Sequence, residues 1–174
     1  KEGITAKPRY ILVFFCIIIC ILLLVPEIVL LLGGRRYIDA VYCLPPLITS
    51  CMIQLIYTMY VNIEFYEKKT FGVSAATIVA TFINIALNYG LIPSYPEKSF
   101  VIASYTTLVG YTVLFIMHYF LVKHMKLDFV YDIKFILLVL LLTIIVSGLM
   151  NLLYRLIVIR YCIILVYSIM ILIF

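Results

Sequence analysis

Residues 62–93 read NIEFYEKKTFGVSAATIVATFINIALNYGLIP, and this stretch decides the fold. It begins with a mixed-charge connection and then enters an apolar segment long enough to cross a lipid bilayer. Polar side chains recur along that segment every three or four residues, so on a helix they share one face: Ser74, Thr77, Thr81, Asn84 and Asn88. This face is too polar for lipid, and we expect it to look at other helices or at a water-filled path.

The composition of the whole chain indicates an integral membrane protein. Hydrophobic residues make up 67% of the chain, charged residues make up 12%, and the mean hydropathy is +1.25. Soluble domains are about half apolar and about a quarter charged. We predict an all-α polytopic membrane protein with about six transmembrane helices, at residues 10–32, 38–64, 72–92, 100–123, 134–153 and 156–174. Because the chain starts without a signal-peptide pattern and ends inside an apolar run, we interpret it as part of a longer protein.

Lysine and arginine residues are unevenly shared between the two sides of the predicted membrane. The segment before the first helix and the second and fourth connections hold eight of them, and the alternate connections hold five. Because positive residues favour the cytoplasmic side, we expect the N-terminal end to be cytoplasmic. The same residues are scattered and form no basic face, so the net charge of +5 does not indicate a nucleic-acid partner.

Three charged residues near the far end of the first predicted helix are candidates for a transport path. Glu27 lies roughly 25 Å along the helix from Tyr10 at 1.5 Å per residue, which places it toward the outer interface. We therefore expect a hydrated carboxylate at Glu27 and not a buried proton carrier. Arg35 and Arg36 follow the helix, and we expect them to anchor the membrane interface or to face a phosphorylated substrate.

Two further polar features lie near the predicted cytoplasmic side. Glu64 and Glu67 could pair as acid and base if the helix continued through them, but Lys68 and Lys69 follow at once. We interpret these carboxylates as part of a solvated loop. His118 could relay protons or serve as an interfacial hydrogen-bonding residue, and the sequence alone names no acidic partner for it.

The sequence contains no pattern typical of an enzyme or of a metal site. It has no phosphate-binding glycine loop, no nucleophile elbow and no cluster of histidine or cysteine ligands. We therefore expect no catalytic residue, no metal and no cofactor. What remains is the polar face of residues 74–88, which we call the polar stripe. In it, Asn84 and Asn88 carry hydrogen-bond donors and acceptors that lipid cannot satisfy. Their partners are either other helices or a substrate.

Four ordered segments carry a resemblance to a known family. They are PEIVLLLGGRRYIDAVY at 26–42, IYTMYVNIEFYEKKT at 56–70, NIALNYGLIP at 84–93, and ASYTTLVGY at 103–111 with MHY at 117–119. In order and spacing they resemble the polysaccharide biosynthesis, or oligosaccharide flippase, family of bacterial membrane transporters. The resemblance covers most of residues 20–125, and the last two predicted helices agree with it only in hydropathy and in the pair at Arg160 and Tyr161.

The resemblance implies both an architecture and a function. Residues 1–125 would form most of the second of two pseudo-symmetric helical bundles, and residues 126–174 would form two closing helices. The implied activity is movement of undecaprenyl-diphosphate-linked oligosaccharide units across the bacterial cytoplasmic membrane by alternating access, for capsule, exopolysaccharide or O-antigen. The implied partners are this substrate and membrane lipids, and H+ and Na+ are both open as coupling ions.

Three other functions stay open from the sequence. One is an ion-coupled drug or metabolite exporter of the same superfamily. Another is a membrane-embedded glycosyltransferase or acyltransferase, and the last is a purely structural membrane subunit. The candidate transport-path residues from all of these observations are Thr77, Thr81, Asn84, Asn88, Glu27, Arg35 and Arg36.

Overall fold

The computed structural model describes residues 8–127, 130–154, 156 and 160–166 of the 174-residue chain. The long helices are α1 (Pro8–Gly33), α2 (Leu44–Tyr66), α3 (Thr70–Leu91), α4 (Ser99–His124) and α5 (Ile133–Leu153). Short 3₁₀ helices connect them: η1 (Arg35–Tyr42), η2 (Ile92–Ser94) and η3 (Pro96–Lys98). All five long helices have the length and apolar composition needed to cross a membrane. The predicted fold class is confirmed, and the protein is an all-α multi-pass membrane protein.

The second helix starts later than the sequence pattern predicts. The sequence predicts a start near residue 38, but α2 begins at Leu44, and Pro45 and Pro46 occupy its first turn. Prolines are favourable there because the first amides of a helix have no intrahelical acceptor. The hydroxyls of Thr49 and Ser50 donate to the carbonyls of Pro45 and Pro46, each at 2.8 Å. The prolines therefore begin the helix and do not interrupt it.

The other predicted boundaries lie within two residues of those observed for α1, α3, α4 and α5. Of the sixth predicted helix, at 156–174, residues 160–166 are helical. Residues 157–159 and 167–174 of that prediction lie outside the described residues.

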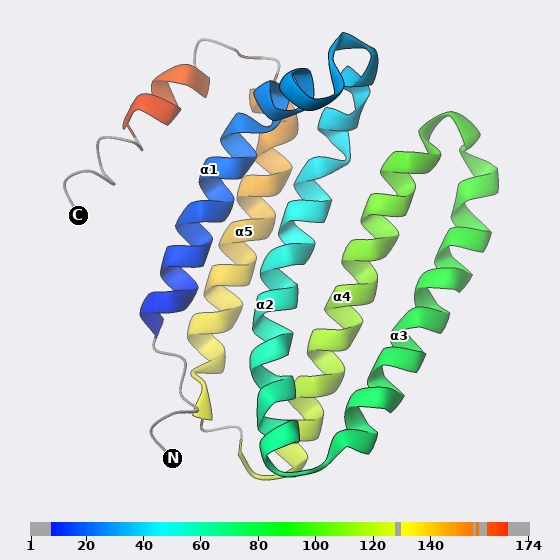
Figure 1. The fold of residues 1–174 in the computed structure, drawn as a ribbon, viewed down its shortest axis with the longest axis vertical. Helices are drawn as coiled ribbons and strands as arrows, with labels where there is room; N and C mark the ends of the chain where they lie inside the picture. Colours follow the sequence, from blue (N-terminus) through cyan, green and yellow to red (C-terminus); the bar gives the residue numbers. More distant parts are fainter. Residues whose placement is uncertain (1–7, 128–129, 155, 157–159, 167–174) are drawn as a thin grey trace.

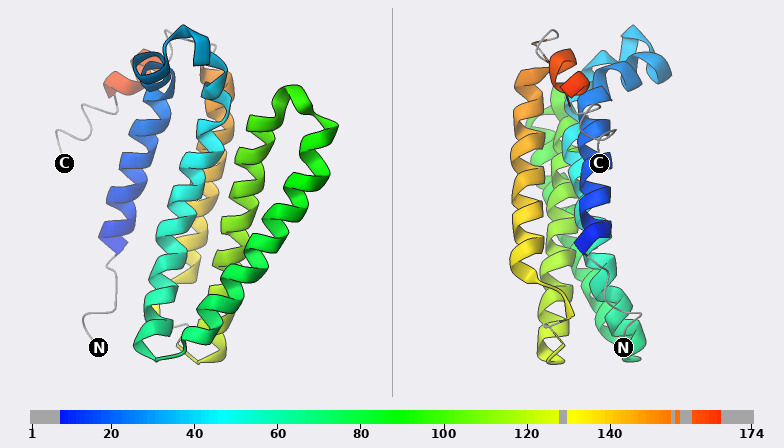
Figure 2. Two further views of the ribbon diagram at one scale, coloured as in Figure 1. Left: turned by 45° about the vertical axis from the view of Figure 1, so that its right-hand side comes forward. Right: turned by 90° about the vertical axis from the view of Figure 1, so that its left-hand side faces the viewer.

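Helix α2 is the centre of the bundle. It packs against α1, α4 and α5, whereas α3 packs mainly against α4 and forms the outer edge (Figure 1). The core between these helices is apolar and includes the fully buried side chains of Leu22, Met52, Ile56 and Ile136. Figure 2 shows α3 and α4 as a hairpin whose two helices run side by side next to α2.

The two ends of the bundle carry different connections. At the lower end of Figure 1, α1, α3 and α5 begin and α2 and α4 end, whereas η1, η2 and η3 lie at the upper end. The two connections that we predict to be cytoplasmic, α2 to α3 and α4 to α5, therefore lie at the lower end, where α1 also begins. Exposed lysines are found there in both connections and beside them: Lys68, Lys69, Lys123, Lys126 and Lys134. Helices α2 and α4 run in the same direction. Two residues a given number of positions apart on α2 can therefore lie beside two residues with the same separation on α4.

Candidate functional site

A polar pocket of about 380 Å³ lies between α2, α3 and α4. Its volume is within the range usual for small-molecule sites. The wall combines hydroxyl, amide and phenol groups with small and apolar residues: Tyr57, Thr77, Ala80, Thr81, Asn84, Thr107, Gly110, Tyr111 and Leu114. The lining side chains include no carboxylate, ammonium or guanidinium group, so the pocket offers uncharged hydrogen-bonding groups. Its Thr77 and Thr81 are exposed, and the pocket is therefore a groove that opens at the surface of the bundle.

Helix α3 contributes three of the predicted path residues to this pocket. Thr77, Thr81 and Asn84 follow one another on one side of α3, and the fully or almost fully buried Ala76 and Ala80 let this helix lie close to its neighbours. The Thr77 hydroxyl donates to the carbonyl of residue 73 at 2.9 Å, and the Thr81 hydroxyl donates to the Thr77 carbonyl at 2.8 Å. Because each hydroxyl proton is donated to a backbone carbonyl, both hydroxyl oxygens are left to accept hydrogen bonds from a ligand.

Asn88, the fourth polar residue of the predicted set on α3, does not line the pocket. Its amide donates to the side-chain oxygen of Asn84 at 2.9 Å, and its own oxygen accepts from the Thr106 hydroxyl at 2.6 Å. A methyl group added at Gly110 would lie 3.4 Å from the Asn84 amide nitrogen, so the absence of a side chain there lets α4 approach. Asn88 thus joins α3 to α4 and holds Asn84 in place at the pocket wall.

One wall of the pocket is aromatic and leads to a buried ion pair. The Tyr57 and Tyr111 rings stack with centroids 6.0 Å apart, and Tyr57 also stacks on the imidazole of His118 at 5.7 Å. Nδ1 of His118 lies 2.6 Å from Oε1 of Glu64, and both side chains are only 1% exposed. The interpretation of Glu64 as part of a solvated loop is therefore wrong, and His118 has an acidic partner.

The physical reason for this correction is the way in which α2 ends. Lys68 adopts a left-handed conformation with φ of 58°, and the Lys69 amide donates to the Glu64 carbonyl at 2.9 Å. This termination keeps Glu64 in the last helical turn and turns the chain toward α3. Glu67 is exposed, as the loop interpretation predicts.

A repeated spacing in the sequence could have revealed the pair. Glu64 follows Tyr57 by seven residues, and His118 follows Tyr111 by seven residues. Seven residues are close to two turns, so each tyrosine and its ionisable residue share a helix face. Because α2 and α4 run in the same direction, the tyrosines meet and the acid meets the base. The sequence does not tell which two helices are neighbours, and the spacing alone therefore was not decisive.

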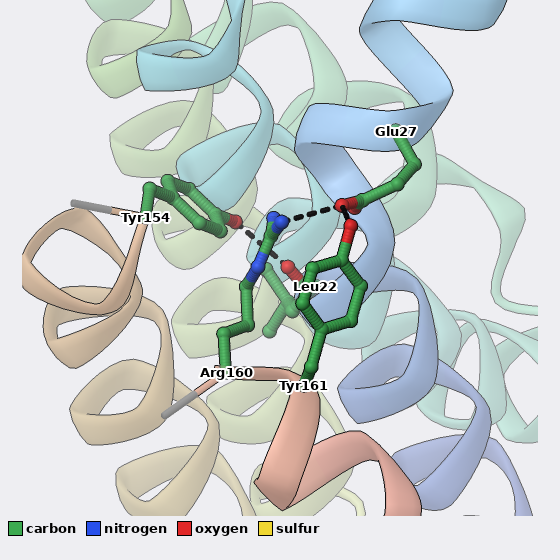
Figure 3. A network of polar contacts seen from close by, with 5 residues as sticks. All are labelled: Leu22, Glu27, Tyr154, Arg160 and Tyr161. Carbon is green, nitrogen blue, oxygen red and sulfur yellow. Dashed lines mark hydrogen bonds and ion pairs between the residues drawn. The ribbon is translucent and has the colours of Figure 1, made fainter. Parts of the chain in front are cut away.

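A second polar cluster lies toward the upper end, between α1, the end of α5 and the 160–166 segment (Figure 3). The guanidinium of Arg160 is ion-paired with the carboxylate of Glu27, and the Tyr161 hydroxyl donates to the same carboxylate oxygen at 2.7 Å. Tyr154, just after α5, donates to the Leu22 carbonyl at 2.8 Å. Burial raises the pKa of the Tyr154 phenol well above its ordinary value. The Glu27 side chain is 34% exposed and also binds the buried Arg160, a partner that the sequence did not reveal.

The structure does not bring all the predicted path residues together. Glu27, Arg35 and Arg36 do not line the polar pocket, and both arginines are exposed in η1 at the upper end. The pocket also includes Tyr57 and Tyr111, which are not among the predicted path residues.

The fold defines the class of this protein as a multi-pass α-helical membrane protein, and a polar groove lies between α2, α3 and α4. Within the described ranges, no three His, Cys, Asp or Glu side chains are grouped to hold a metal ion. Comparison of the chain with family models, curated proteins and solved structures gave no match.

Proposed function

We propose that this protein is a flippase that moves lipid-linked oligosaccharide units across the bacterial cytoplasmic membrane, with its N-terminal end in the cytoplasm. The observation that carries the proposal is the uncharged polar groove between α2, α3 and α4 of an apolar helical bundle. Sugars present many hydroxyl groups, and the amide, hydroxyl and phenol groups of Asn84, Thr81 and Tyr111 are suitable partners for them. The ordered segments that resemble the oligosaccharide flippase family support the same function.

The lining of the pocket favours this substrate over the small cations of a drug exporter. Recognition of a cation inside a membrane protein calls for a carboxylate at the site, because an unpaired charge is costly in a low-dielectric environment. No carboxylate lines the pocket, and the nearest acid that we identify, Glu64, is already paired with His118.

A membrane-embedded transferase is the less favoured alternative. General acid–base catalysis requires an acid or base within hydrogen-bond reach of the substrate. The Glu64–His118 pair is the obvious candidate, but both side chains are 1% exposed and neither lines the pocket.

The outer surface of the bundle suits the lipid part of the proposed substrate. Large apolar side chains are exposed along α1 and α5, among them Leu31, Leu138 and Leu141. Arg35 and Arg36 are exposed in η1, directly after α1, and their guanidinium groups are suitable partners for a diphosphate headgroup. Membrane lipids and the lipid-linked substrate are therefore the proposed partners.

The test is deletion of the full gene in the source bacterium, followed by analysis of surface glycan and lipid-linked intermediates. We expect repeat units to accumulate on the cytoplasmic side and surface polysaccharide to be lost. An unchanged glycan profile without accumulation would overturn the proposal.

Complementation with pocket variants then tests the site itself. Thr81→Val and Asn84→Leu should fail to restore the surface glycan at normal membrane levels of protein. Ser74→Ala is the matched control, because Ser74 belongs to the same stripe of α3 and does not line the pocket. Normal transport by the double variant Asn84→Leu/Asn88→Leu would favour a purely structural role, and ion-coupled efflux of small cations by the purified protein would favour an exporter.

A further inference from the structure

We propose that Glu64 and His118 form a proton-binding site that holds α2 and α4 together at the lower end of the bundle. We call this contact between the two side chains the latch. The two side chains meet between these helices with 2.6 Å from Nδ1 to Oε1, and each is 1% exposed. The proton site stands on this geometry alone, whereas its coupling to transport rests on the proposed function.

The net charge of the buried pair explains why a proton would control the latch. When the pair holds the proton, an imidazolium donates to a carboxylate and the site is neutral overall. When the proton leaves, a neutral imidazole remains beside a buried carboxylate, and the site carries one uncompensated negative charge. Such a charge is strongly unfavourable in a low-dielectric interior. Release of the proton and access of water to the pair are therefore linked, and water reaches the buried pair when the helices packed around it move apart.

The surroundings of the pair supply no other charge that could compensate for the lost proton. Within the described ranges, the only basic side chain within ion-pair distance of Glu64 is His118, and Oε2 of Glu64 is buried without a hydrogen-bond partner. Gly72 of α3 lies next to this oxygen, because a methyl group added there would be 3.1 Å from Oε2.

The remaining titratable groups on the described parts of the packed elements are phenols, the exposed Cys51 thiol and exposed charged groups, which include Glu67 just after α2 and His124 at the end of α4. Tyr57 of α2 stacks on His118, and Tyr111 of α4 stacks on Tyr57. Tyr60 of α2 packs against Tyr119 of α4 and against Tyr131, which precedes α5. The exposed amines are those of Lys68 and Lys69 before α3, Lys123 at the end of α4 and Lys134 at the start of α5.

Tyr57 provides a direct path from the proton site to the polar pocket. Its ring stacks on the His118 imidazole with 13° between the ring planes, and the same residue lines the pocket. Movement of His118 when the latch opens must therefore shift one wall of the pocket. Proton occupancy and ligand occupancy are coupled through this one side chain.

A tryptophan reporter at position 57 tests the proton site without any substrate. The 174 residues contain no tryptophan, so Tyr57→Trp places an indole against His118, where imidazole protonation changes its emission. The full-length variant in lipid nanodiscs is titrated from about pH 4 to about pH 9, which spans the ordinary titration of carboxyl and imidazole groups. We expect a single sigmoidal step that His118→Gln abolishes and Glu64→Gln displaces along the pH axis.

Matched controls lie within a few residues of each partner. Glu67→Gln and His124→Gln remove an exposed carboxylate and an exposed imidazole from the same helix ends, and both should leave the step unchanged. A step that survives His118→Gln, or no step at all, would overturn the proposal. If Tyr57→Trp does not fold, the ¹⁵N resonances of His118 are titrated in the His124→Gln variant, where an imidazole that never changes protonation state would equally overturn it.

Transport assays separate this inference from the proposed function. Proton titration of the pair without any movement of lipid-linked oligosaccharide would refute the flippase and leave the proton site intact. Oligosaccharide transport that persists unchanged in Glu64→Gln and His118→Gln, at all values of the pH gradient, would refute the coupling and leave the flippase intact.

Discussion

His118 Nδ1 lies 2.6 Å from Glu64 Oε1, although the two residues are 54 positions apart in the chain. Their meeting depends on α2 and α4 running in the same direction with α3 between them in sequence (Figure 1). The pair joins two helices that would otherwise contact each other mainly through apolar and aromatic groups.

The first prediction concerns the energetic coupling of this pair. His118→Leu alone leaves a buried carboxylate without its partner and should reduce the free energy of unfolding by roughly 3–5 kcal/mol. The double variant Glu64→Leu/His118→Leu should recover most of this loss, because it removes both buried polar groups. Reversible unfolding in detergent measures all the variants, with Glu67→Leu as an exposed control. Additive losses in the double variant would contradict the prediction.

The second prediction compares two glycines of α3. Gly90 has open space where a methyl group would be added, so Gly90→Ala should stabilise the helix by about 0.5–1 kcal/mol. At Gly72 the added methyl would lie 3.1 Å from both Glu64 Oε2 and Leu121 Cδ1. We expect Gly72→Ala to lose this gain and to lower the thermal midpoint relative to Gly90→Ala. An equal rise for both variants would show that the contact at Gly72 adapts without cost.

The third prediction concerns the cluster at the upper end (Figure 3). Arg160→Met leaves Glu27 without its basic partner and should cost about 1–3 kcal/mol of stability, less than a fully buried pair because Glu27 is partly exposed. Combining it with Glu27→Gln should recover part of the loss. Tyr154→Phe removes a single hydrogen bond to the Leu22 carbonyl and should cost about 1 kcal/mol. Thermal unfolding of the unsubstituted protein and these three variants in one detergent provides the comparison.

The fourth prediction separates structure from ligand contact on α3. Thr106→Val removes the donor to Asn88 and should cost about 0.6 kcal/mol, the average for a hydrogen bond between membrane helices. Thr81→Val removes a hydroxyl at the pocket wall that bonds only to its own helix, and it should leave stability nearly unchanged while impairing transport. The measurement is unfolding in detergent together with complementation of the deletion strain. A stability loss at Thr81 larger than that at Thr106 would reverse the assignment.

The polar stripe of α3 shows how much of the candidate site can be predicted from the sequence. Its spacing predicts that Thr77, Thr81 and Asn84 share one side of a helix, and these three residues do line one pocket. The spacing could not separate Asn88, which bonds to Asn84 and Thr106, because that difference depends on where α4 crosses α3. Likewise, the hydropathy of the first helix placed Glu27 near its far end but gave no sign of the pairing with Arg160, which is 133 positions away.

The sequence by itself determined the all-α membrane fold and most of the helix boundaries, because length, apolar composition and helical spacing are local properties of the chain. Only the tertiary structure decided which polar groups became partners. Glu64 beside Lys68 and Lys69 has the local pattern of a solvated loop, yet it is buried because the chain turns at Lys68 and α4 supplies His118. Contacts between helices depend on their order and direction in the bundle, and no local pattern carries that information.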